Sequence, residues 1–241
     1  MNNKEKKERT TLTVITATCN AAACLPRLIA SLREQTDRDF EWVVADGASD
    51  DGTLELLKGV TDLNLVISSQ PDFGIYDALN RAIRIASGEY YIVAGADDLF
   101  DHAAIANFRR AIDSSGADII IAKATYGKRR MEVRKGASWL LGHVAFIASH
   151  TLATAFRKDL HRLYGFYSRK FPIAADQLFV MRACEGGASR HESNFVAGEI
   201  GHGGVSTMDR VGNATEVFRV QLDLGHSRVV QTLLLMFRLL K

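Results

Sequence analysis

The chain has 241 residues, 47% of them hydrophobic and 24% charged, with a formal net charge of +2 at pH 7. These values are ordinary for a globular protein, and the small charge argues against nucleic-acid binding, which normally requires a concentrated basic face. The three cysteines are odd in number and lack the spacing of zinc ligands, so we expect a reducing, cytoplasmic environment. No apolar run reaches the ~18 residues that a membrane-spanning helix needs.

Strands and helices are predicted to alternate along the first half of the chain. Apolar and β-branched runs predict strands at 12–18, 41–45, 63–67, 90–94 and 118–122. The spacing of apolar residues predicts helices at 25–32, 53–57, 75–86 and around 105–108, the third of them stopped by Gly88. This alternation predicts an α/β fold with a doubly wound, mostly parallel sheet flanked by helices.

The alternation becomes irregular beyond residue 125. We predict strands at 128–134 and 152–156, a helix at 176–184 and a loop at 198–204. The predicted organisation is a disordered charged tail at 1–10, a single domain at 11–208 and a C-terminal helical segment at 209–241. Within the domain, a nucleotide-binding half would span about 11–125 and a less regular acceptor-side half about 126–208.

The end of the chain is apolar and basic. Residues 229–240 are mostly apolar and are accompanied by Arg228, Arg238 and Lys241. An amphipathic helix of this composition can lie on an anionic membrane surface. It can equally pack against the body of the protein or against a second subunit.

Carboxylates follow two of the predicted buried strands. Asp97 and Asp98 come directly after the strand at 90–94, and Asp46 follows the strand at 41–45. Open α/β sheets bind ligands at the carboxyl ends of their strands, and two adjacent carboxylates repel each other unless a cation joins them. The pattern indicates a metal–nucleotide site, although an Asp-Asp pair can also cap the next helix. Neither a dinucleotide-binding glycine motif nor a phosphate-binding P-loop is present.

An ordered set of segments resembles the family 2 glycosyltransferases. The resemblance covers roughly residues 11–206 and is carried by Thr18-Cys19-Asn20, 28–35, 41–53, 70–80, Gly88-Glu89-Tyr90 and Ala96-Asp97-Asp98. It is closest to bacterial enzymes that build exopolysaccharide, capsule or lipopolysaccharide. It implies a GT-A fold and a hexosyltransferase-type enzyme that moves a sugar, with inversion, from a nucleotide-diphosphate sugar to a saccharide or lipid-linked saccharide. A UDP-sugar would be the default donor, and Mn²⁺ or Mg²⁺ the cofactor.

The resemblance also implies roles for the residues that match. It makes Asp176 the catalytic base, Asp98 the metal ligand, and Thr18, Asn20, Asp46 and Asp97 nucleotide-binding residues. Tyr76, Asp77 and Asn80 would border the donor sugar, and His150, Gly203 and Gly204 the acceptor or a phosphate. From the residues alone, Asp77 could equally be an acid favoured by the helix dipole, and Asp176 a helix N-cap. Relatives usually carry a basic residue where Phe73 stands, so we expect no phosphate contact from that side chain.

Two other functions are less consistent with the residues. A sugar nucleotidyltransferase would need a glycine-rich, arginine-containing loop after the first strand, and residues 16–23 do not provide one. A nucleotide-sugar-binding protein without catalysis would be favoured by the loss of Asp98 or Asp176, and both are present. The expected partners are a nucleotide sugar and a glycan or lipid-linked glycan. Peripheral contact with the inner face of the membrane and a homo-oligomer are left open, and nucleic acid is not expected.

Overall fold

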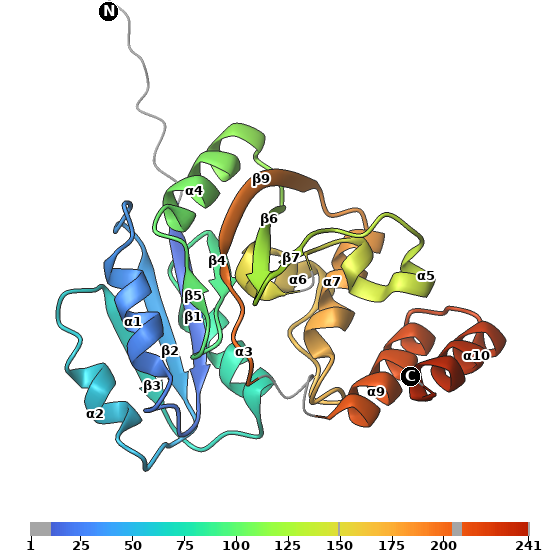
Figure 1. Cartoon of the computed structure of the whole chain (residues 1–241), viewed down its shortest axis with the longest axis horizontal. Helices are drawn as coiled ribbons and strands as arrows, with labels where there is room; N and C mark the ends of the chain where they lie inside the picture. Colours follow the sequence, from blue (N-terminus) through green and yellow to red (C-terminus); the bar gives the residue numbers. More distant parts are fainter. Residues whose placement is uncertain (1–10, 149, 204–208, 241) are drawn as a thin grey trace, which may run out of the picture.

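The computed structural model describes residues 11–148, 150–203 and 209–240 (Figure 1). The described residues form a nine-stranded sheet. Its strands are β1 (Leu12–Thr18), β2 (Glu41–Asp46), β3 (Leu65–Ser69), β4 (Tyr90–Val93), β5 (Leu99–Phe100), β6 (Ile119–Tyr126), β7 (Arg129–Met131), β8 (Thr154–Arg157) and β9 (Arg190–Glu199). The order across the sheet is β3-β2-β1-β4-β8-β6-β9-β5, and β7 pairs with β6.

The direction of the strands agrees with the predicted α/β sheet. β3, β2, β1 and β4 pair in parallel. β8 lies antiparallel between β4 and β6, so β6 runs in the same direction as the first four strands without touching them. The predicted strand at 118–122 is therefore confirmed, with a later segment inserted between it and β4. The predicted hairpin strand at 128–134 is also confirmed, as the shorter β7.

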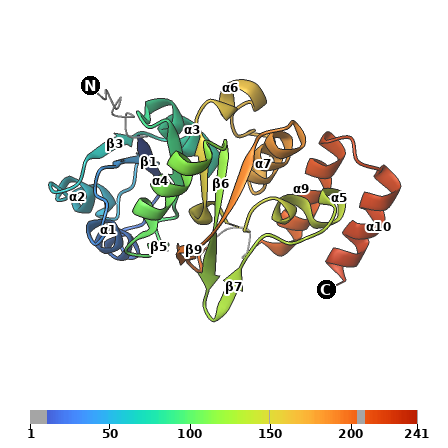
Figure 2. The ribbon, with the colours of Figure 1, turned by 90° about the horizontal axis from the view of Figure 1, so that it is seen from above.

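Helices cover the sheet and extend beyond it (Figures 1 and 2). They are α1 (Leu25–Arg33), α2 (Thr53–Lys58), α3 (Ile75–Ile85), α4 (Ala104–Ser115), α5 (Ser138–Leu141), α6 (Leu160–Tyr164), α7 (Ala175–Glu185), α9 (Arg210–Asp223) and α10 (Arg228–Leu239), with the 3₁₀ turns η1 (Gly142–Ala145) and η2 (Thr151–Ala153). In both views α9 and α10 lie at the opposite end of the molecule from α2. Among the described residues, no helix is both long and apolar enough to cross a bilayer.

Two local predictions are corrected. The helix α3 ends at Ile85 with Ala86 as its C-cap, so Gly88 does not stop it. A Cβ atom at Gly88 would lie 2.6 Å from Oγ1 of Thr13, which means that glycine is needed there for close approach to β1. The segment 198–199 belongs to β9 and not to a loop. β9 itself was not predicted, because its residues are largely half-exposed and its apolar pattern is weak.

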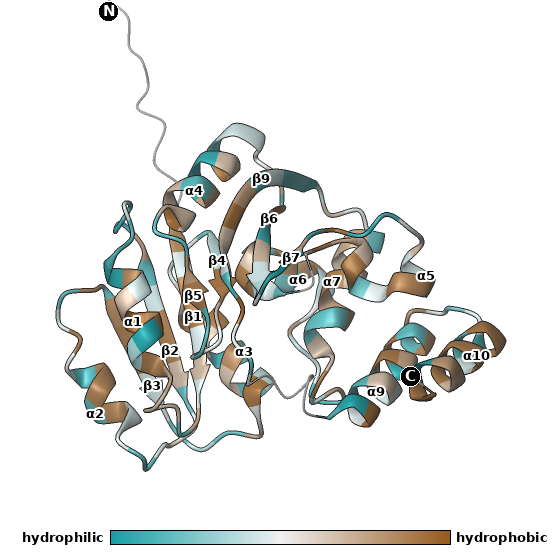
Figure 3. Ribbon diagram, in the orientation of Figure 1, coloured by the Kyte–Doolittle hydropathy of each residue, from teal (hydrophilic) through white to brown (hydrophobic). Residues whose placement is uncertain are grey.

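The core is built from the apolar runs that the sequence shows. Every residue of β4 is buried, as are all but one residue of β1 and all but one of β2, as expected for central strands with helices on both faces. Figure 3 shows hydrophobic colour along these strands and also on much of α10. Several of these apolar residues of α10 are exposed to solvent: Leu233 is 62% accessible and Phe237 is 56% accessible.

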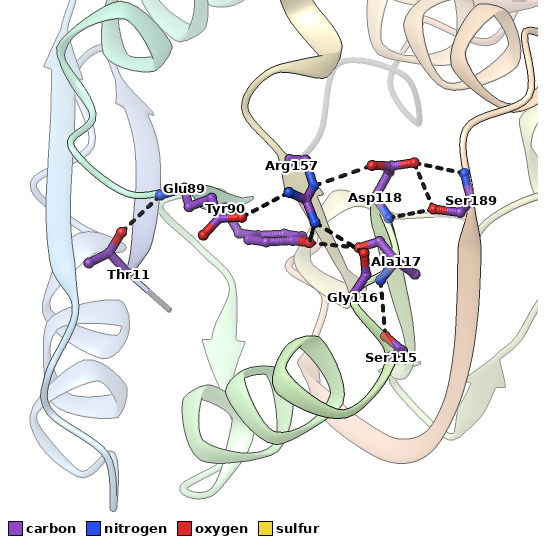
Figure 4. Close-up of polar contacts among 9 residues, drawn as sticks. All are labelled: Thr11, Glu89, Tyr90, Ser115, Gly116, Ala117, Asp118, Arg157 and Ser189. Atoms are coloured by element: carbon purple, nitrogen blue, oxygen red, sulfur yellow. Dashed lines mark hydrogen bonds and ion pairs between the residues drawn. The ribbon is translucent and has the colours of Figure 1, made fainter. Parts of the chain in front are cut away.

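A polar network holds β8 in place at the amino ends of β4 and β6 (Figure 4). The Arg157 guanidinium forms ion pairs with Glu89 (2.9 Å) and Asp118 (3.2 Å) and donates to the hydroxyl of Tyr90 (2.6 Å). Asp118 in turn accepts hydrogen bonds from the backbone N–H and the hydroxyl of Ser189, next to β9. The network is at the edge of the sheet opposite the carboxylates described below, so it stabilises the inserted strand without taking part in the site.

Candidate active site

The carboxyl ends of β1, β2 and β3 meet around the carboxylate of Asp46. This side chain is fully buried and accepts hydrogen bonds from the hydroxyls of Thr18 (2.9 Å), Ser49 (2.6 Å) and Ser69 (2.8 Å). Burial by itself would raise the pKa of Asp46, but these hydroxyls and the N–H of Ser49 together lower it below the usual value. Asp46 is therefore ionised at neutral pH, and Thr18 lies beside it as predicted.

Asn20 joins two loops at this edge. Its side-chain oxygen accepts from the N–H of Asp50 (3.0 Å), and its own N–H donates to the hydroxyl of Ser49 (2.8 Å). Both Asn20 (φ 51°) and Ala48 (φ 61°) have left-handed backbone conformations, which asparagine tolerates and alanine adopts only at a cost. The two loops are thus held in one defined shape beside Asp46, with Asn20 exposed to solvent.

Asp97 and Asp98 follow β4 at the same edge but differ in exposure. Asp98 is 1% exposed, and its two oxygens accept from the N–H groups of Gly95 (2.7 Å) and Gly201 (2.8 Å). Asp97 is only half-buried and accepts from the N–H of Gly203 (2.9 Å). A side chain at Gly201 would collide with Asp97, since a Cβ atom there would lie 2.0 Å from its Cγ. The loop after β9 therefore closes over the acid pair.

The surroundings of Asp98 disfavour the charged form of its carboxyl group. Burial raises the pKa of its carboxyl, and the effects of His150 and of the N–H groups of Gly201 and Gly95 offset this only in part. Nδ1 of His150 lies 3.8 Å from Oδ2 of Asp98, so this histidine borders the acid pair. Gly203 does too, whereas Gly204 lies outside the described residues.

The donor set suits a hard divalent cation that is also bound by a substrate. In the part of the chain that the structure describes, no group of three or more His, Cys, Asp or Glu residues could hold a metal ion. Two carboxylates are nevertheless enough for Mg²⁺ or Mn²⁺ when phosphates and water complete the coordination. Asp97 is the more accessible of the two carboxylates, and Asp98 supports the loop beneath it.

The three α3 residues predicted near the donor sugar have different surroundings. Asp77 forms an ion pair with Arg169 and accepts a hydrogen bond from the N–H of Phe73. The hydrogen bond from Arg169 is the main cause that lowers the pKa of Asp77 below its usual value, and the N–H of Phe73 adds to it. Asn80 is 5% exposed, and its amide both accepts from and donates to the backbone of Tyr167. The geometry thus favours structural roles for Asp77 and Asn80. Of the three residues, only Tyr76 forms a hydrogen bond to another predicted site residue, Asp176.

Position 73 is not basic itself, but the basic side chain of Arg169 lies near Phe73. The guanidinium of Arg169 is 5.3 Å from the centre of the Phe73 ring, and its side chain is 67% exposed. Arg81, also on α3, donates to the backbone oxygen of Asp46 (2.8 Å). Sequence reasoning singled out neither arginine. Arg81 could have been noticed because it follows Asp77 by one turn of the predicted helix. Arg169 lies far along the chain, and no pattern in the sequence marked it.

Asp176, the predicted base, is the second residue of α7 and faces α3. Its Oδ1 accepts from the Tyr76 hydroxyl (2.7 Å) and from the N–H of Gln177 (2.8 Å). The same Tyr76 hydroxyl lies 2.8 Å from the backbone oxygen of Ile173. Burial raises the pKa of Tyr76 well above its usual value, and the adjacent Asp176 adds to this. Tyr76 is therefore a neutral hydrogen-bond donor that connects α3 to the candidate base.

The turn that leads into Asp176 is held by a residue that sequence analysis missed. Glu216 on α9 is 6% exposed, and its Oε2 accepts from the backbone N–H groups of Ile173 (2.8 Å) and Ala174 (2.9 Å). These N–H groups directly precede α7, whose N-cap residue Ala174 has no side-chain cap. Glu216 thus caps α7 from another helix. No local pattern marks it, since its partners lie 42 and 43 residues away.

The chain is similar in sequence to known proteins over most of its length. The sequence model of Glycosyl transferase family 2 matches residues 13–172. A PGL/p-HBAD biosynthesis glycosyltransferase of Mycobacterium bovis (strain BCG / Pasteur 1173P2) is 31% identical over 176 residues, covering 70% of this chain and 68% of the relative.

Two solved structures share the fold. S. aureus TarS 1-349 in complex with UDP-GlcNAc has a TM-score of 0.68 at 22% identity, covering 95% of this chain and 71% of that one. The mannosyltransferase PcManGT from Pyrobaculum calidifontis, in complex with GDP-Man and Mn²⁺, has a TM-score of 0.69 at 21% identity, covering 89% and 64%. The GT-A fold expected from the sequence is thereby confirmed. The chain belongs to glycosyl transferase family 2 and is a glycosyltransferase.

Proposed function

We propose that this enzyme transfers a sugar, with inversion, from a UDP-sugar to a hydroxyl group of a saccharide or lipid-linked saccharide in the synthesis of a surface glycan. The observation that carries the proposal is the hydrogen bond from Tyr76 to Asp176, which places a carboxylate beside the helix that starts at the donor edge of the sheet. A relative acts in PGL/p-HBAD biosynthesis, and a structural neighbour was solved with UDP-GlcNAc. Both names support a nucleotide-sugar donor and a glycan product.

The nucleoside would lie against Thr18, Asn20 and Asp46. The ionised Asp46 is fully buried and already accepts hydrogen bonds from the hydroxyls of Thr18 and Ser69 and from the hydroxyl and N–H of Ser49. A base or ribose would therefore contact the groups that Asp46 holds in place, or would replace one of the hydroxyls as its donor. Because these groups are already ordered, binding would not first have to order them. Asn20 keeps the two loops around the nucleoside in one shape.

The family resemblance makes Asp98 the metal ligand and places Asp97 with the nucleotide. Because Asp98 is almost fully buried, the more accessible Asp97 would share the divalent cation with it, while Asp98 also holds the N–H groups of Gly95 and Gly201. The ion would neutralise negative charge on the departing diphosphate. The solved mannosyltransferase contains Mn²⁺, which supports the use of a divalent ion. Asp97 is half-buried and Asp98 is buried, which supports different roles for the two acids in binding the cation and in holding the loop.

Asp176 would take the proton from the acceptor hydroxyl as that oxygen attacks the sugar. An inverting transfer needs one carboxylate on the face opposite the leaving group. The single proton of the Tyr76 hydroxyl is shared between two acceptors, the oxygen of Ile173 and the carboxylate of Asp176. When Asp176 gains a proton, it can donate to the Tyr76 oxygen while Tyr76 donates to Ile173. Every polar group then has a partner, so the arrangement accommodates the protonated base.

The test combines a donor screen with one substitution. Purified protein incubated with a panel of nucleotide sugars and glycan acceptors should release UDP from one UDP-sugar and give a product of opposite anomeric configuration. Asp176→Asn should lower turnover by about 10²–10⁴-fold, as expected on losing a general base, with donor affinity unchanged. A product of retained configuration, or near-normal transfer by Asp176→Asn, would contradict the proposed mechanism.

The enzyme would work at the cytoplasmic face of a membrane through α10. The exposed apolar residues of α10 lie close to Trp139 and Leu140 of α5, since Gln231 and Arg238 donate to the backbone oxygens of these two residues. Trp139 and Leu140 are each 44% exposed. No acidic residue occurs between Asp223 and the last residue given, so α10 itself carries no side chain that would repel an anionic lipid surface.

A further inference from the structure

A cavity lies between α5, α7, α9 and α10, and one of its lining residues is Gln177, which follows the candidate base in the chain. It has a volume of about 550 Å³ and is lined by residues of α5 and η1, of α7, of α9 and of α10: Leu141, Gly142, His143, Gln177, Arg210, Asn213, Ala214, Val217 and Arg238. Gln177 directly follows Asp176 in the chain and lies 3.5 Å from Asn213 across the cavity wall. The donor-side residues Asp46, Asp97 and Asp98 do not line it, so it is distinct from the nucleotide site.

The lining of this cavity carries the positive charge of two arginines. Arg210 and Arg238 come from different helices, and none of the described lining residues is acidic. Arg238 donates to the backbone oxygen of Leu140 (3.2 Å), but its Nη1 is enclosed and has no hydrogen-bond partner among the described residues. Burial lowers the pKa of Arg238. A partly buried cation with no acidic partner among the described lining residues is costly, and a bound anion would relieve that cost.

The neighbourhood suggests which anion would fit. Arginine recognises phosphate by paired hydrogen bonds from its planar guanidinium, and the amides of Gln177 and Asn213 can add donors. The helix that carries Arg238 is apolar on its exposed side. A ligand with an anionic group in the cavity could therefore have a sugar hydroxyl near Asp176 and a hydrocarbon part along α10.

We propose that this cavity binds the phosphate group of a phosphorylated acceptor through Arg210 and Arg238. The inference rests on the proposed function, since it treats Asp176 as the residue that meets the acceptor hydroxyl. The chemistry recognised is a phosphate monoester or diphosphate, which could belong to a lipid-linked saccharide or to a water-soluble sugar phosphate. In either case the cavity would hold the acceptor while leaving the nucleotide site free for the donor.

The direct test is binding of inorganic phosphate and of decyl phosphate to the full chain by calorimetry. Excess UDP and Mg²⁺ are present so that the phosphate-binding part of the donor site is already filled. Arg210→Gln and Arg238→Gln should each weaken binding by about tenfold or more, the effect expected on losing a charged hydrogen bond. Arg182→Gln is the matched control, because Arg182 on α7 pairs with Asp223 and does not line the cavity; it should leave the affinity unchanged.

Each outcome bears on the proposal. Tighter binding of decyl phosphate than of inorganic phosphate would assign the site to a lipid-linked acceptor, and equal binding to a soluble phosphate; both support the cavity. Absence of binding, or full binding by both cavity variants, would overturn it. Arg238→Gln could disturb α10, so its melting temperature is measured, while Arg210 is exposed and its variant should fold normally.

Activity separates this inference from the proposed function. If wild-type protein transfers sugar and Asp176→Asn does not, but the acceptor KM is unchanged in Arg210→Gln and Arg238→Gln, the cavity is not the acceptor site and the proposed function stands. If no nucleotide sugar supports transfer, the proposed function fails, whereas the phosphate titration still reports on the cavity by itself.

Discussion

Glu216 and Ala174 lie 42 residues apart, yet the carboxylate of the first accepts a hydrogen bond of 2.9 Å from the N–H of the second, at the start of the helix that carries Asp176. The matched family region ends at residue 172, so both the candidate base and its support lie beyond it. α9 thus stabilises the turn that leads into α7 and the candidate base.

Replacing Glu216 should reduce turnover more than donor binding. Glu216→Ala leaves two N–H groups unpaired, which should cost about 1–3 kcal/mol of stability for each group that stays buried and loosen the turn before Asp176. We expect kcat to fall about tenfold or more, as a ~1.4 kcal/mol loss of transition-state stabilisation would give, with the affinity for UDP unchanged. Steady-state kinetics and calorimetry would measure the two effects.

Two further variants show whether Glu216 acts through Asp176. Glu216→Gln keeps an oxygen that can accept both N–H groups and should largely restore turnover. Gln221→Ala is the matched control, because Gln221 is equally buried on α9 but donates to the backbone of Ser138; it should lower stability without a selective loss of kcat. An Asp176→Asn background should also hide the effect of Glu216→Ala, and additive losses would contradict the positioning role.

UDP binding should depend on a divalent cation and on the acid pair after β4. We expect calorimetry to detect tight binding with Mn²⁺ or Mg²⁺ and little with a chelator. Asp97→Asn should weaken metal-dependent binding by about tenfold or more, because a charged ligand is lost. Asp98→Asn should also weaken it and lower the melting temperature, since its oxygens hold Gly95 and Gly201. Unchanged affinity in both variants would remove the acid pair from metal binding.

Stability should fall between neutral and acidic pH because of His161. This side chain is 4% exposed, with Nε2 at 2.6 Å from the Tyr91 hydroxyl and Nδ1 at 3.0 Å from the oxygen of Gly165. Burial lowers its pKa from 6.5 to about 4. The folded state therefore resists protonation, so stability is complete above pH 6.5 and declines as the unfolded chain takes up a proton, levelling off near pH 4.

The loss attributable to His161 could reach about 3 kcal/mol, at ~1.4 kcal/mol for each unit of pKa shift. Denaturant unfolding at a series of pH values would measure it. His161→Gln cannot take up a proton in this range, so the decline between these pH values should be shallower in this variant, whatever its stability at neutral pH. An equal slope in both proteins would assign the pH dependence to other groups.

Anionic vesicles should bind the protein through α10. Leu233→Glu and Met236→Glu place a negative charge on exposed apolar positions that are 62% and 56% accessible, and should reduce sedimentation with phosphatidylglycerol vesicles. Leu163→Glu on α6, also at a 62% exposed leucine, is the matched control and should sediment normally. Equal sedimentation of all four proteins would leave α10 without a membrane role.

The meeting of Thr18, Asp46 and Asp97 at one edge of the sheet could be predicted because its signal is local. Apolar runs end at Thr18, Asp46 and Asp97, and parallel strands necessarily bring their carboxyl ends to one edge. The hydrogen bond from Thr18 to Asp46 follows directly from the pairing of those two strand ends. The helix predicted at 176–184 is also present, as α7 (Ala175–Glu185) with Asp176 in its first turn.

The amino-acid sequence alone therefore determined the α/β class, the family and the residues that end the central strands, because burial pattern and motif order are properties of short segments. Only the tertiary structure decided that β8 lies between β4 and β6. It also decided that the amide of Asn80 is hydrogen-bonded to the backbone of Tyr167, and that Tyr76 donates to Asp176, 100 residues further along the chain. These contacts depend on where distant segments pack, and apolar periodicity says which face of a segment is buried without saying against which partner.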